Sequence, residues 1–480
     1  MSVRVKVNRN VLEMEYAVRG PIPKRAAELR DQGMRTIPCN IGNPQALGQQ
    51  PISYYREVLA LLEVPNRIQR EKKLRDLYRS SAALRERLEE KDLVSPYVLD
   101  VASEFLAQIG TGMGAYTDSN GPRFIREAVA HFIDARDGAD GGGGVKSDPN
   151  SIFLTNGASE AAKYLIEMLV ADRNDGIMIP IPQYPLYSAA IRKVGGVQVN
   201  YYPDEEAGWA LDRSILDESF KQAGSRGVTV KAIVVINPAN PTGAILSEES
   251  AREVVDFAQE HDLAIIADEV YQENLYGAEF VSFARLVGDR PIPLFSLHST
   301  SKGFYGECGH RGGYVEMRNP PLIEDTDQSF GDVLLKQASV SLCSNTAGQA
   351  LTFLMVSPPE EHSEPYEQFI EERTAVLKDL YEKGTMIREA FKQMDDMECF
   401  GRTGAMYLFP RLGKLPPETT DFDYCMSLLE STGICTVNGS GFGQREGTSH
   451  LRVAFLPPQE MLKEVMPKWI DFHNEYVNRG

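Results

Sequence analysis

Short apolar runs alternate with helical stretches through the middle of the chain. From about residue 100 the runs recur as SIFL, GIMIP, VQVNYY, KAIVVIN, LAIIADEV, IPLFSLH and GGYVEM. Most of them are separated by segments with apolar residues at helical spacing, such as SEAAKYLIEMLVA and SEESAREVVDFAQEH. Runs rich in β-branched residues that alternate with helices are typical of a parallel sheet covered by helices on both faces. We therefore predict an α/β fold with a large, mostly parallel sheet flanked by helices.

The two ends of the chain have a different pattern. Residues 1–100 are mostly helical and charged in pattern, with REKKLRDLYRSSAALRERLEEKD as the clearest polar helix. One long helical pattern covers 358–394, and the last region mixes helices with the short runs CTVNGS and LRVAFL. We predict an N-terminal arm that contributes to a small domain (1–100), a large domain that holds the ligand (101–370) and a smaller α+β domain (371–480).

Composition and charge narrow the classes of partner. The 480 residues are 42% hydrophobic and 25% charged, which is typical of a soluble globular protein. No apolar run approaches the ~18 residues of a membrane span, so we expect no membrane partner. The net charge of -18 argues against a nucleic-acid partner, and an acidic ligand would have to be met by local arginines.

The cysteines and the N-terminal residues indicate a compartment. The six cysteines form no C-x-x-C pair, and no cluster with histidine has zinc spacing, so no metal site is expected. Reduced thiols are typical of a reducing compartment. MSVRVKVNRN contains no apolar core of a secretory signal. We expect a cytoplasmic protein.

The densest group of reactive side chains lies in SLHSTSKGFYGECGHRGGYVE, residues 296–316. Ser299, Ser301, Lys302 and Arg311 fall between the end of one apolar run and the start of the next. We therefore place them on a loop between two strands. Its glycines allow tight turns and a close approach to a ligand.

Four other stretches place polar side chains at strand ends. Ala158 and Ser159 open a helix after a strand, where free amides attract an anion, although Ser159 could be a simple helix cap. Asn240 lies between two proline turns in NPANPTG, and Asp268 ends a buried run, where a carboxylate needs a cation. Arg452 lies in the apolar run LRVAFL and requires a carboxylate, from the protein or from a ligand.

Together these groups suit one cofactor. A helix N-terminus with serines and an arginine fits a phosphate, an isolated lysine fits a Schiff base, and a buried carboxylate fits a protonated ring nitrogen. Pyridoxal 5'-phosphate (PLP) requires all three. Each motif is weak alone, but five of them in order at strand ends indicate a PLP site.

The sequence resembles the PLP-dependent aminotransferases of fold type I, class I and II, and within them the alanine aminotransferases. The resemblance covers nearly the whole chain and is carried by EYAVRGPI, CNIGNPQ, NPANPTG, DEVYQENLY and STSKGFYGECGHRGGY. It implies that the large domain (101–370) binds PLP. It also implies an α/β fold with a mostly parallel sheet in this domain and a smaller α+β domain.

The resemblance implies a role for each cofactor residue. Lys302 would bind the cofactor covalently and move a proton between it and the substrate α-carbon, and Asp268 would keep the ring nitrogen protonated. Tyr271 and Asn240 would donate hydrogen bonds to the phenolic ring oxygen, and Tyr184 would stack on the ring. The phosphate would be held by Ala158, Ser159, Ser299, Ser301 and Arg311.

It also implies the substrate residues and the assembly. Arg452 would bind the substrate α-carboxylate, with Asn240 and the backbone of Gly42 nearby, although Gly42 could be only a turn residue. Tyr116 matches a tyrosine that reaches the phosphate of a neighbouring subunit, so a homodimer with shared sites is expected. Tyr184 and Tyr116 could also be core aromatics. Arg19 is the candidate for the second carboxylate of glutamate.

The expected reaction is a reversible ping-pong transamination from L-alanine to 2-oxoglutarate. A glutamate–glyoxylate aminotransferase shares the motifs. A lyase similar to 1-aminocyclopropane-1-carboxylate synthase shares the fold and the cofactor residues. A regulator built on this fold usually carries an added basic module, which the acidic chain does not show.

Overall fold

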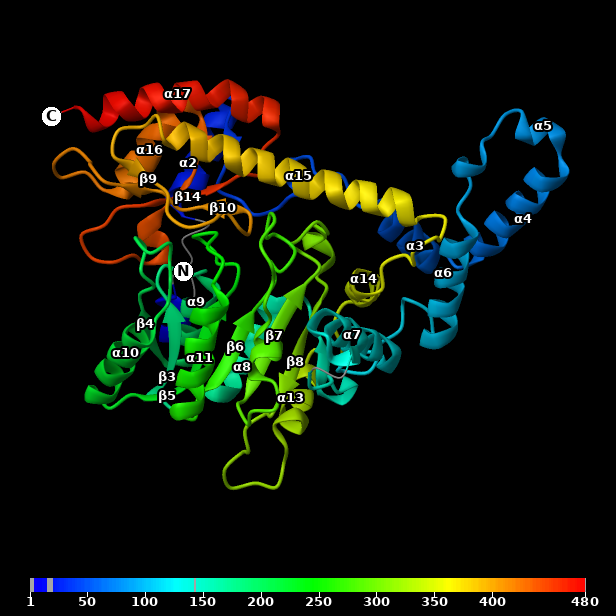
Figure 1. Ribbon diagram of the computed structural model, residues 1–480, viewed down its shortest axis with the longest axis horizontal. Helices are drawn as coiled ribbons and strands as arrows, with labels where there is room; N and C mark the ends of the chain where they lie inside the picture. Colours follow the sequence, from blue (N-terminus) through cyan, green and yellow to red (C-terminus); the bar gives the residue numbers. More distant parts are fainter. Residues whose placement is uncertain (1–3, 15–19, 142–143, 480) are drawn as a thin grey trace.

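The computed structural model describes residues 4–14, 20–141 and 144–479, and forms two lobes (Figure 1). The large lobe contains a seven-stranded sheet in the order β2-β8-β7-β6-β5-β3-β4. All neighbours in this sheet are parallel except at β8, which is antiparallel to β2 and to β7. This confirms the predicted mostly parallel sheet. The strands are β2 (Ile152–Leu154), β3 (Asp175–Pro180), β4 (Val197–Tyr201), β5 (Thr229–Ile236), β6 (Ala264–Asp268), β7 (Leu294–Ser299) and β8 (Gly313–Arg318).

The reversal at β8 follows from the connection before it. The other strand connections along this part of the chain contain helices, which a parallel crossover needs. Between Ser299 and Gly313 the chain makes only a turn and one short 3-10 helix (Cys308–His310). A connection this compact brings β8 back beside β7 in the antiparallel sense, with Ser299 opposite Gly313. The loop with Ser301, Lys302 and Arg311 is therefore fixed at both ends by the sheet.

Helices cover both faces of this sheet because its strands are apolar on both sides. Val234 of β5 faces one core cluster with α8 and α9, and the next residue, Val235, faces another cluster with α10, α11 and α12. A third cluster joins β2 and β8 to helices α3 (Ser53–Glu63), α6 (Pro96–Ile109), α7 and α14. The helices of the large lobe are α7 (Arg123–Asp137), α8 (Ala158–Leu169), α9 (Leu186–Val194), α10 (Arg213–Ser225), α11 (Glu248–Glu260), α12 (Phe283–Val287), α13 (Phe330–Ser339) and α14 (Thr346–Val356).

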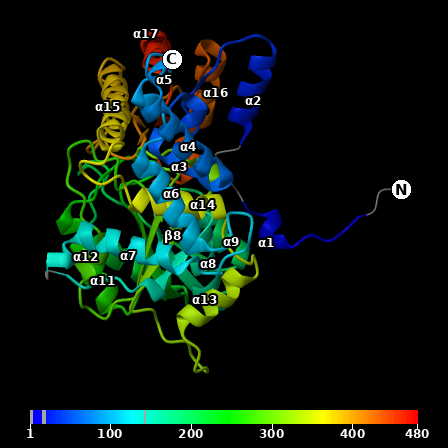
Figure 2. The same ribbon diagram turned by 90° about the vertical axis from the view of Figure 1, so that its right-hand side faces the viewer.

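The small lobe is built from both ends of the chain. β1 (Ile37–Pro38) pairs in parallel with β12 (Ile434–Cys435), and α2 (Pro21–Asp31) lies beside α16 (Figure 2). A second sheet has the order β10-β14-β13. The remaining elements are α15 (Tyr366–Phe391), β9 (Met397–Glu398), β10 (Tyr407–Leu408), β11 (Arg411–Leu412), α16 (Asp421–Thr432), β13 (Val437–Asn438), β14 (Leu451–Ala454) and α17 (Gln459–Val477).

The helices before residue 110 differ in part from the prediction. The polar helix expected over 70–92 is two helices, α4 (Asn66–Ser80) and α5 (Ala82–Arg85). Ser81 interrupts them, because its backbone is extended and its hydroxyl accepts from the N–H of Leu84 at 3.4 Å. The other three helices are α1 (Arg9–Leu12), α3 (Ser53–Glu63) and α6 (Pro96–Ile109).

Two further observations concern the long helix and the helix lengths. The helical pattern over 358–394 forms α15, which begins only at Tyr366, after Pro365. The domain boundaries near residues 100 and 370 stay predictions. Across the described ranges, the helices are too short or too polar to cross a lipid bilayer.

Candidate active site

A cavity of about 220 Å³ lies at the carboxyl ends of β5, β6 and β7. This is the edge of an open α/β sheet where ligands commonly bind. Gly42, Tyr407 and Arg452 close it from the segment after β1 and from β10 and β14 of the small lobe. The other residues that line it are Ala158, Ser159, Tyr184, Leu186, Ile236, Asn240, Asp268, Val270, Tyr271, Ser299, Ser301, Lys302, Cys308 and Arg311.

Lys302 lies in the turn after β7, half-buried at the cavity wall. Its Nζ donates a hydrogen bond of 2.8 Å to the carbonyl oxygen of Gly42 and lies 5.8 Å from the centre of the Tyr271 ring. A β-carbon on Gly42 would collide with the hydroxyl of Tyr407. The glycine therefore lets the backbone pass close enough to hold the lysine amine, which is more than the turn role considered for it.

Asp268 is the last residue of β6 and is buried. Its Oδ2 accepts a hydrogen bond of 2.7 Å from the hydroxyl of Tyr187, whereas its Oδ1 has no partner among the described residues. Burial raises the pKa of Asp268 to about 6, and the Tyr187 hydrogen bond acts in the opposite direction. One buried carboxylate oxygen is thus left to accept from a cationic N–H of a ligand.

The N-terminus of α8 forms one end of the cavity. Its capping residue is Gly157, which has a positive φ of 78° and has no side chain to cap the helix. The first amides of the helix are therefore open to an anion. Arg311 is held beside them, because its Nη2 donates to the hydroxyl of Ser159 at 3.1 Å and to the carbonyl of Asn156 at 2.8 Å.

Ser299 at the end of β7 and Ser301 in the loop after it extend this anion site. The Oγ of Ser301 is buried and has no hydrogen-bond partner within the described ranges. The Oγ of Ser299 donates to the carbonyl of Gly312 at 3.1 Å and accepts from the N–H of Ser301. A buried hydroxyl without a partner is costly, which favours a ligand oxygen at this place.

Arg452 is 1% exposed and lines the same cavity. Its Nη1 donates to Oδ1 of Asn240 at 3.1 Å and its Nη2 to the carbonyl of Asn40 at 2.7 Å. The guanidinium lies between the rings of Tyr407 and Phe442, at 4.4 and 4.7 Å. Its hydrogen-bond partners are an amide and a backbone oxygen, and none of the described carboxylates pairs with it, so a ligand is left as the source of the carboxylate.

Twelve of the fourteen residues that the sequence indicated line this one cavity. Tyr116 does not: it is 75% exposed and borders a separate surface hollow with Thr117 and Arg123. Arg19 lies outside the described residues. Within a single chain, Tyr116 therefore lies away from the cavity, and the position of Arg19 relative to the cavity is not described.

Sequence reasoning missed three polar residues of the site. Tyr407 carries no motif that marks it, since GAMYLFP is an ordinary apolar run. Tyr187 lies in the first turn of α9, and no pattern in PQYPLY marks it as a partner of Asp268. Cys308 lines the cavity and donates its thiol to the carbonyl of Ser301 at 3.1 Å.

These observations test the fit of PLP. The open amides of α8 with the unpartnered hydroxyl of Ser301 suit its phosphate, and the unpartnered Oδ1 of Asp268 suits its ring nitrogen. The amine of Lys302 lines the same cavity and, among the described residues, donates one hydrogen bond, to the backbone oxygen of Gly42. The residues present fit the cofactor.

Comparisons with known proteins agree with this chemistry. The family model described as aminotransferase class I and II matches residues 87–468. A Dictyostelium discoideum relative named probable alanine aminotransferase, mitochondrial, is 39% identical over 98% of this chain and 88% of its own. Glutamate–glyoxylate aminotransferase 2 of Arabidopsis thaliana is 39% identical over 98% of this chain and 96% of its own. The solved alanine aminotransferase of Pyrococcus furiosus is 26% identical with a TM-score of 0.76, over 98% of this chain and 100% of that one. The chain belongs to the class I and II aminotransferases, PLP-dependent transaminases of fold type I.

Proposed function

We propose that the protein is an alanine aminotransferase, which transfers the amino group of L-alanine to 2-oxoglutarate and yields pyruvate and L-glutamate, reversibly. The observation that carries the proposal is Arg452, a buried guanidinium on the same cavity as Lys302 whose carboxylate partner is missing among the described residues. Amino and 2-oxo acids share the α-carboxylate that such a group binds in two hydrogen bonds. Relatives that carry the alanine aminotransferase name support alanine as the donor.

Nine residues besides Lys302 would hold the cofactor in this reaction. Bound PLP supplies an aldehyde that takes up the amino group and a ring that withdraws electrons. Asp268 would accept from the ring N–H, and Tyr271 and Asn240 would donate to the ring oxygen, while Tyr184 would pack against the ring. The phosphate would lie at the start of α8, held by Ala158, Ser159, Ser299, Ser301 and Arg311.

Lys302 would move the proton that the reaction requires. Its amine would act as the general base and acid, removing the proton at the substrate α-carbon and holding it for return. The carbonyl of Gly42 holds this amine at the cavity wall, 2.8 Å away. The side chain of Asn240 and the backbone of Asn40 fix the plane of the Arg452 guanidinium, so that the α-carboxylate is bound in one orientation.

The substrate pair tests the proposal directly. Purified holoenzyme is given L-alanine with 2-oxoglutarate, or L-glutamate with either pyruvate or glyoxylate, and all products are quantified. We expect pyruvate to form from alanine and to be preferred over glyoxylate as acceptor. A preference for glyoxylate would assign the glutamate–glyoxylate reaction instead. Formation of 1-aminocyclopropane-1-carboxylate from S-adenosylmethionine would assign the lyase.

Arg19 is proposed to pair with the side-chain carboxylate of glutamate and 2-oxoglutarate. A site that accepts both a methyl group and a carboxylate needs a cation that pairs with the acid and is dispensable for alanine. Arg19→Ala should therefore weaken the binding of glutamate much more than the binding of alanine. Equal losses for both substrates would contradict this role.

We also propose a homodimer with shared sites. The proposal starts from Tyr116, which the family resemblance places against the phosphate of a neighbouring subunit and which is 75% exposed within one chain. Size-exclusion chromatography with light scattering should give twice the chain mass. Lys302→Ala and Tyr116→Ala proteins, each impaired alone, should regain activity when their subunits are mixed and exchanged. A monomer, or no recovery on exchange, would contradict the shared site.

We propose the cytoplasm as the compartment. All six cysteines are free thiols, which fits a reducing compartment. The mitochondrial name of the Dictyostelium discoideum relative makes the mitochondrion the competing assignment. Fractionation of the source cells should recover the activity with cytoplasmic markers, and recovery with mitochondrial markers would overturn the assignment.

A further inference from the structure

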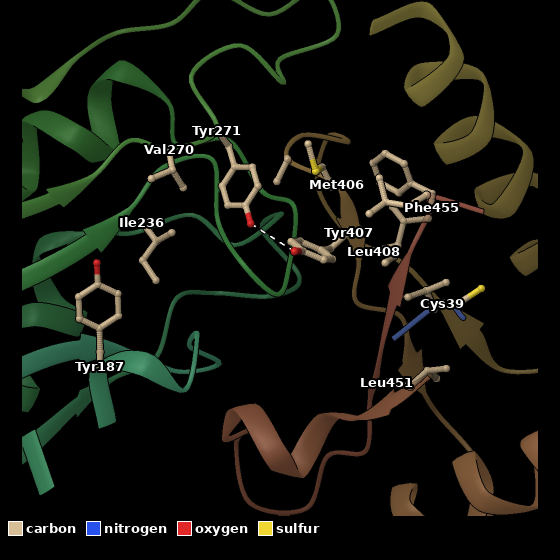
Figure 3. Close-up of a cluster of buried hydrophobic side chains, with 14 of the residues drawn as sticks. Cys39, Tyr187, Ile236, Val270, Tyr271, Met406, Tyr407, Leu408, Leu451 and Phe455 are labelled. Carbon is tan, nitrogen blue, oxygen red and sulfur yellow. Dashed lines mark hydrogen bonds between the residues drawn. The ribbon is translucent and has the colours of Figure 1, made fainter. Parts of the chain in front are cut away.

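The two lobes meet at a pair of tyrosines inside the cavity. Tyr271 follows β6 of the large lobe and Tyr407 lies on β10 of the small lobe, and their hydroxyls point toward one another (Figure 3). The hydroxyl of Tyr271 donates to that of Tyr407 at 3.3 Å, and both residues are 2% exposed. Because both side chains are buried, this hydrogen bond is protected from competition by water.

The ring of Tyr407 has a second contact. Its face lies 4.4 Å from the guanidinium carbon of Arg452, which is held on its other side by Phe442. Its hydroxyl also lies next to Gly42, where a β-carbon would collide with it. One side chain thus contacts the proposed carboxylate site with its face and the proposed ring-oxygen donor with its hydroxyl.

The charges around Tyr407 differ from those around Tyr271. Burial alone would raise the pKa of the Tyr407 phenol, but Lys302 and Arg452 together hold it below its ordinary value. Tyr271 and the thiol of Cys308 are the other titratable groups that face it. The pKa of Tyr271 is raised, chiefly by burial. The pair therefore consists of one phenol with a lowered pKa, Tyr407, and one with a raised pKa, Tyr271.

We propose that Tyr407 is a positioning residue, whose hydroxyl orients and strengthens Tyr271 as a donor to the cofactor ring oxygen while its ring face holds Arg452. The inference rests on the proposed role of Tyr271 in PLP binding. When Tyr271 turns its only proton to the ring oxygen, its own oxygen is free to accept from Tyr407. The two phenols then form a chain of hydrogen bonds, in which the second donor strengthens the first.

Two substitutions separate the two contacts. Tyr407→Phe removes the hydroxyl and keeps the ring against Arg452, whereas Tyr407→Leu removes both. Each variant, loaded with PLP, is titrated with acid and base while the absorbance of the bound cofactor is recorded. Weaker donation by Tyr271 disfavours the anionic ring oxygen, so Tyr407→Phe should move the midpoint upward by about 0.7 on the pH scale, the effect of one ordinary hydrogen bond.

Tyr271→Phe provides the decisive background. If Tyr407 acts through Tyr271, Tyr407→Phe should shift the midpoint by less than about 0.2 when Tyr271 is already phenylalanine. An equal shift in both backgrounds, or none in the wild-type background, would overturn the proposal. Unbound PLP is removed before the titration, so that only cofactor bound to folded protein is recorded and partial unfolding of a variant leaves the midpoint readable.

The ring contact has its own measurement. Tyr407→Phe should leave the KM for 2-oxoglutarate within about twofold, and Tyr407→Leu should raise it about tenfold, because a buried cation–π contact is lost. Equal KM values for the two variants would overturn this half of the proposal. The pH titration needs no amino acid, so a wild-type protein that binds PLP but fails to convert alanine would refute the proposed substrate and leave the Tyr407 test intact.

Discussion

The hydroxyl of Tyr187 donates a 2.7 Å hydrogen bond to Oδ2 of Asp268, while Oδ1 of the same carboxylate has no partner in the described part of the chain. Asp268 is buried, which raises its pKa to about 6, and the hydrogen bond favours its charged form. Tyr187 thus helps the carboxylate to remain ionised at neutral pH, which the proposed contact with a protonated ring nitrogen requires.

Tyr187→Phe should therefore weaken cofactor binding. Loss of a hydrogen bond to a charged group corresponds to about 1.5–3 kcal/mol, or at least a tenfold rise in the Kd for PLP. The pKa of Asp268 should rise, so the pH above which PLP binds tightly should move upward. Titration of apoenzyme with PLP between about pH 5 and 9 measures both. Tyr201→Phe is the matched control, since Tyr201 is equally buried but donates to the backbone of Val234, at 2.8 Å.

Arg452→Lys should impair both half-reactions. The variant keeps the charge but loses the two parallel donors that Asn240 and Asn40 hold in place. We expect the KM of L-alanine and of 2-oxoglutarate to rise about 100-fold, with the absorbance of bound PLP unchanged. Arg445→Lys is the control, because Arg445 stacks on Tyr202 instead. This variant should behave like the wild type. Unchanged KM values in Arg452→Lys would exclude it as the carboxylate site.

Gly157→Ala tests the anion site at α8. The residue has a φ of 78°, and a β-carbon there would lie 2.8 Å from Nη2 of Arg311. The backbone strain should lower the free energy of unfolding by about 1–2 kcal/mol, and displacement of Arg311 should weaken PLP binding about tenfold. Gly138→Ala separates the two effects, because Gly138 has a φ of 75° with open space around it. It should lose stability while keeping its affinity for PLP.

Glu269 gives the apoenzyme a stability that depends on pH. It is 2% exposed and accepts from the N–H of Phe283 at 2.8 Å, and burial raises its pKa to about 7 although Arg136 attracts its charge. A carboxyl whose pKa is raised by folding binds a proton more tightly in the folded state, so its stabilising effect is lost as pH rises from about 4.5 to about 7. The free energy of unfolding of Glu269→Gln relative to wild type should increase across this window. A difference in the free energy of unfolding that stays constant across this window would contradict a raised pKa of Glu269 in the folded state.

The strand ends were predictable because their chemistry is local. Asp268 and the Lys302 loop each follow a buried apolar run, and a parallel sheet brings such positions to one edge. The order of the strands in the sheet brings these loops together. The alternating pattern indicated a sheet with helices on both faces, but it did not indicate this order. The same local signals fail where structure depends on one residue: Ser81 divides the helix expected over 70–92.

The remaining site residues depend on long-range packing. Tyr407 reaches the cavity because β10 pairs with β14, which also carries Arg452. A register between strands more than forty residues apart has no signature in GAMYLFP. Tyr187 reaches Asp268 through the packing of α9 on the sheet. β1 joins the small lobe through its pairing with β12. Such contacts depend on tertiary structure, which local periodicity does not encode.

The central claim is that the amine of Lys302 carries the cofactor. Native holoenzyme treated with borohydride, digested and analysed by mass spectrometry should show the reduced PLP adduct on the peptide that contains Lys302, and Lys302→Ala should show none. An unmodified Lys302 in protein that has bound PLP, or an adduct on another lysine, would contradict the account.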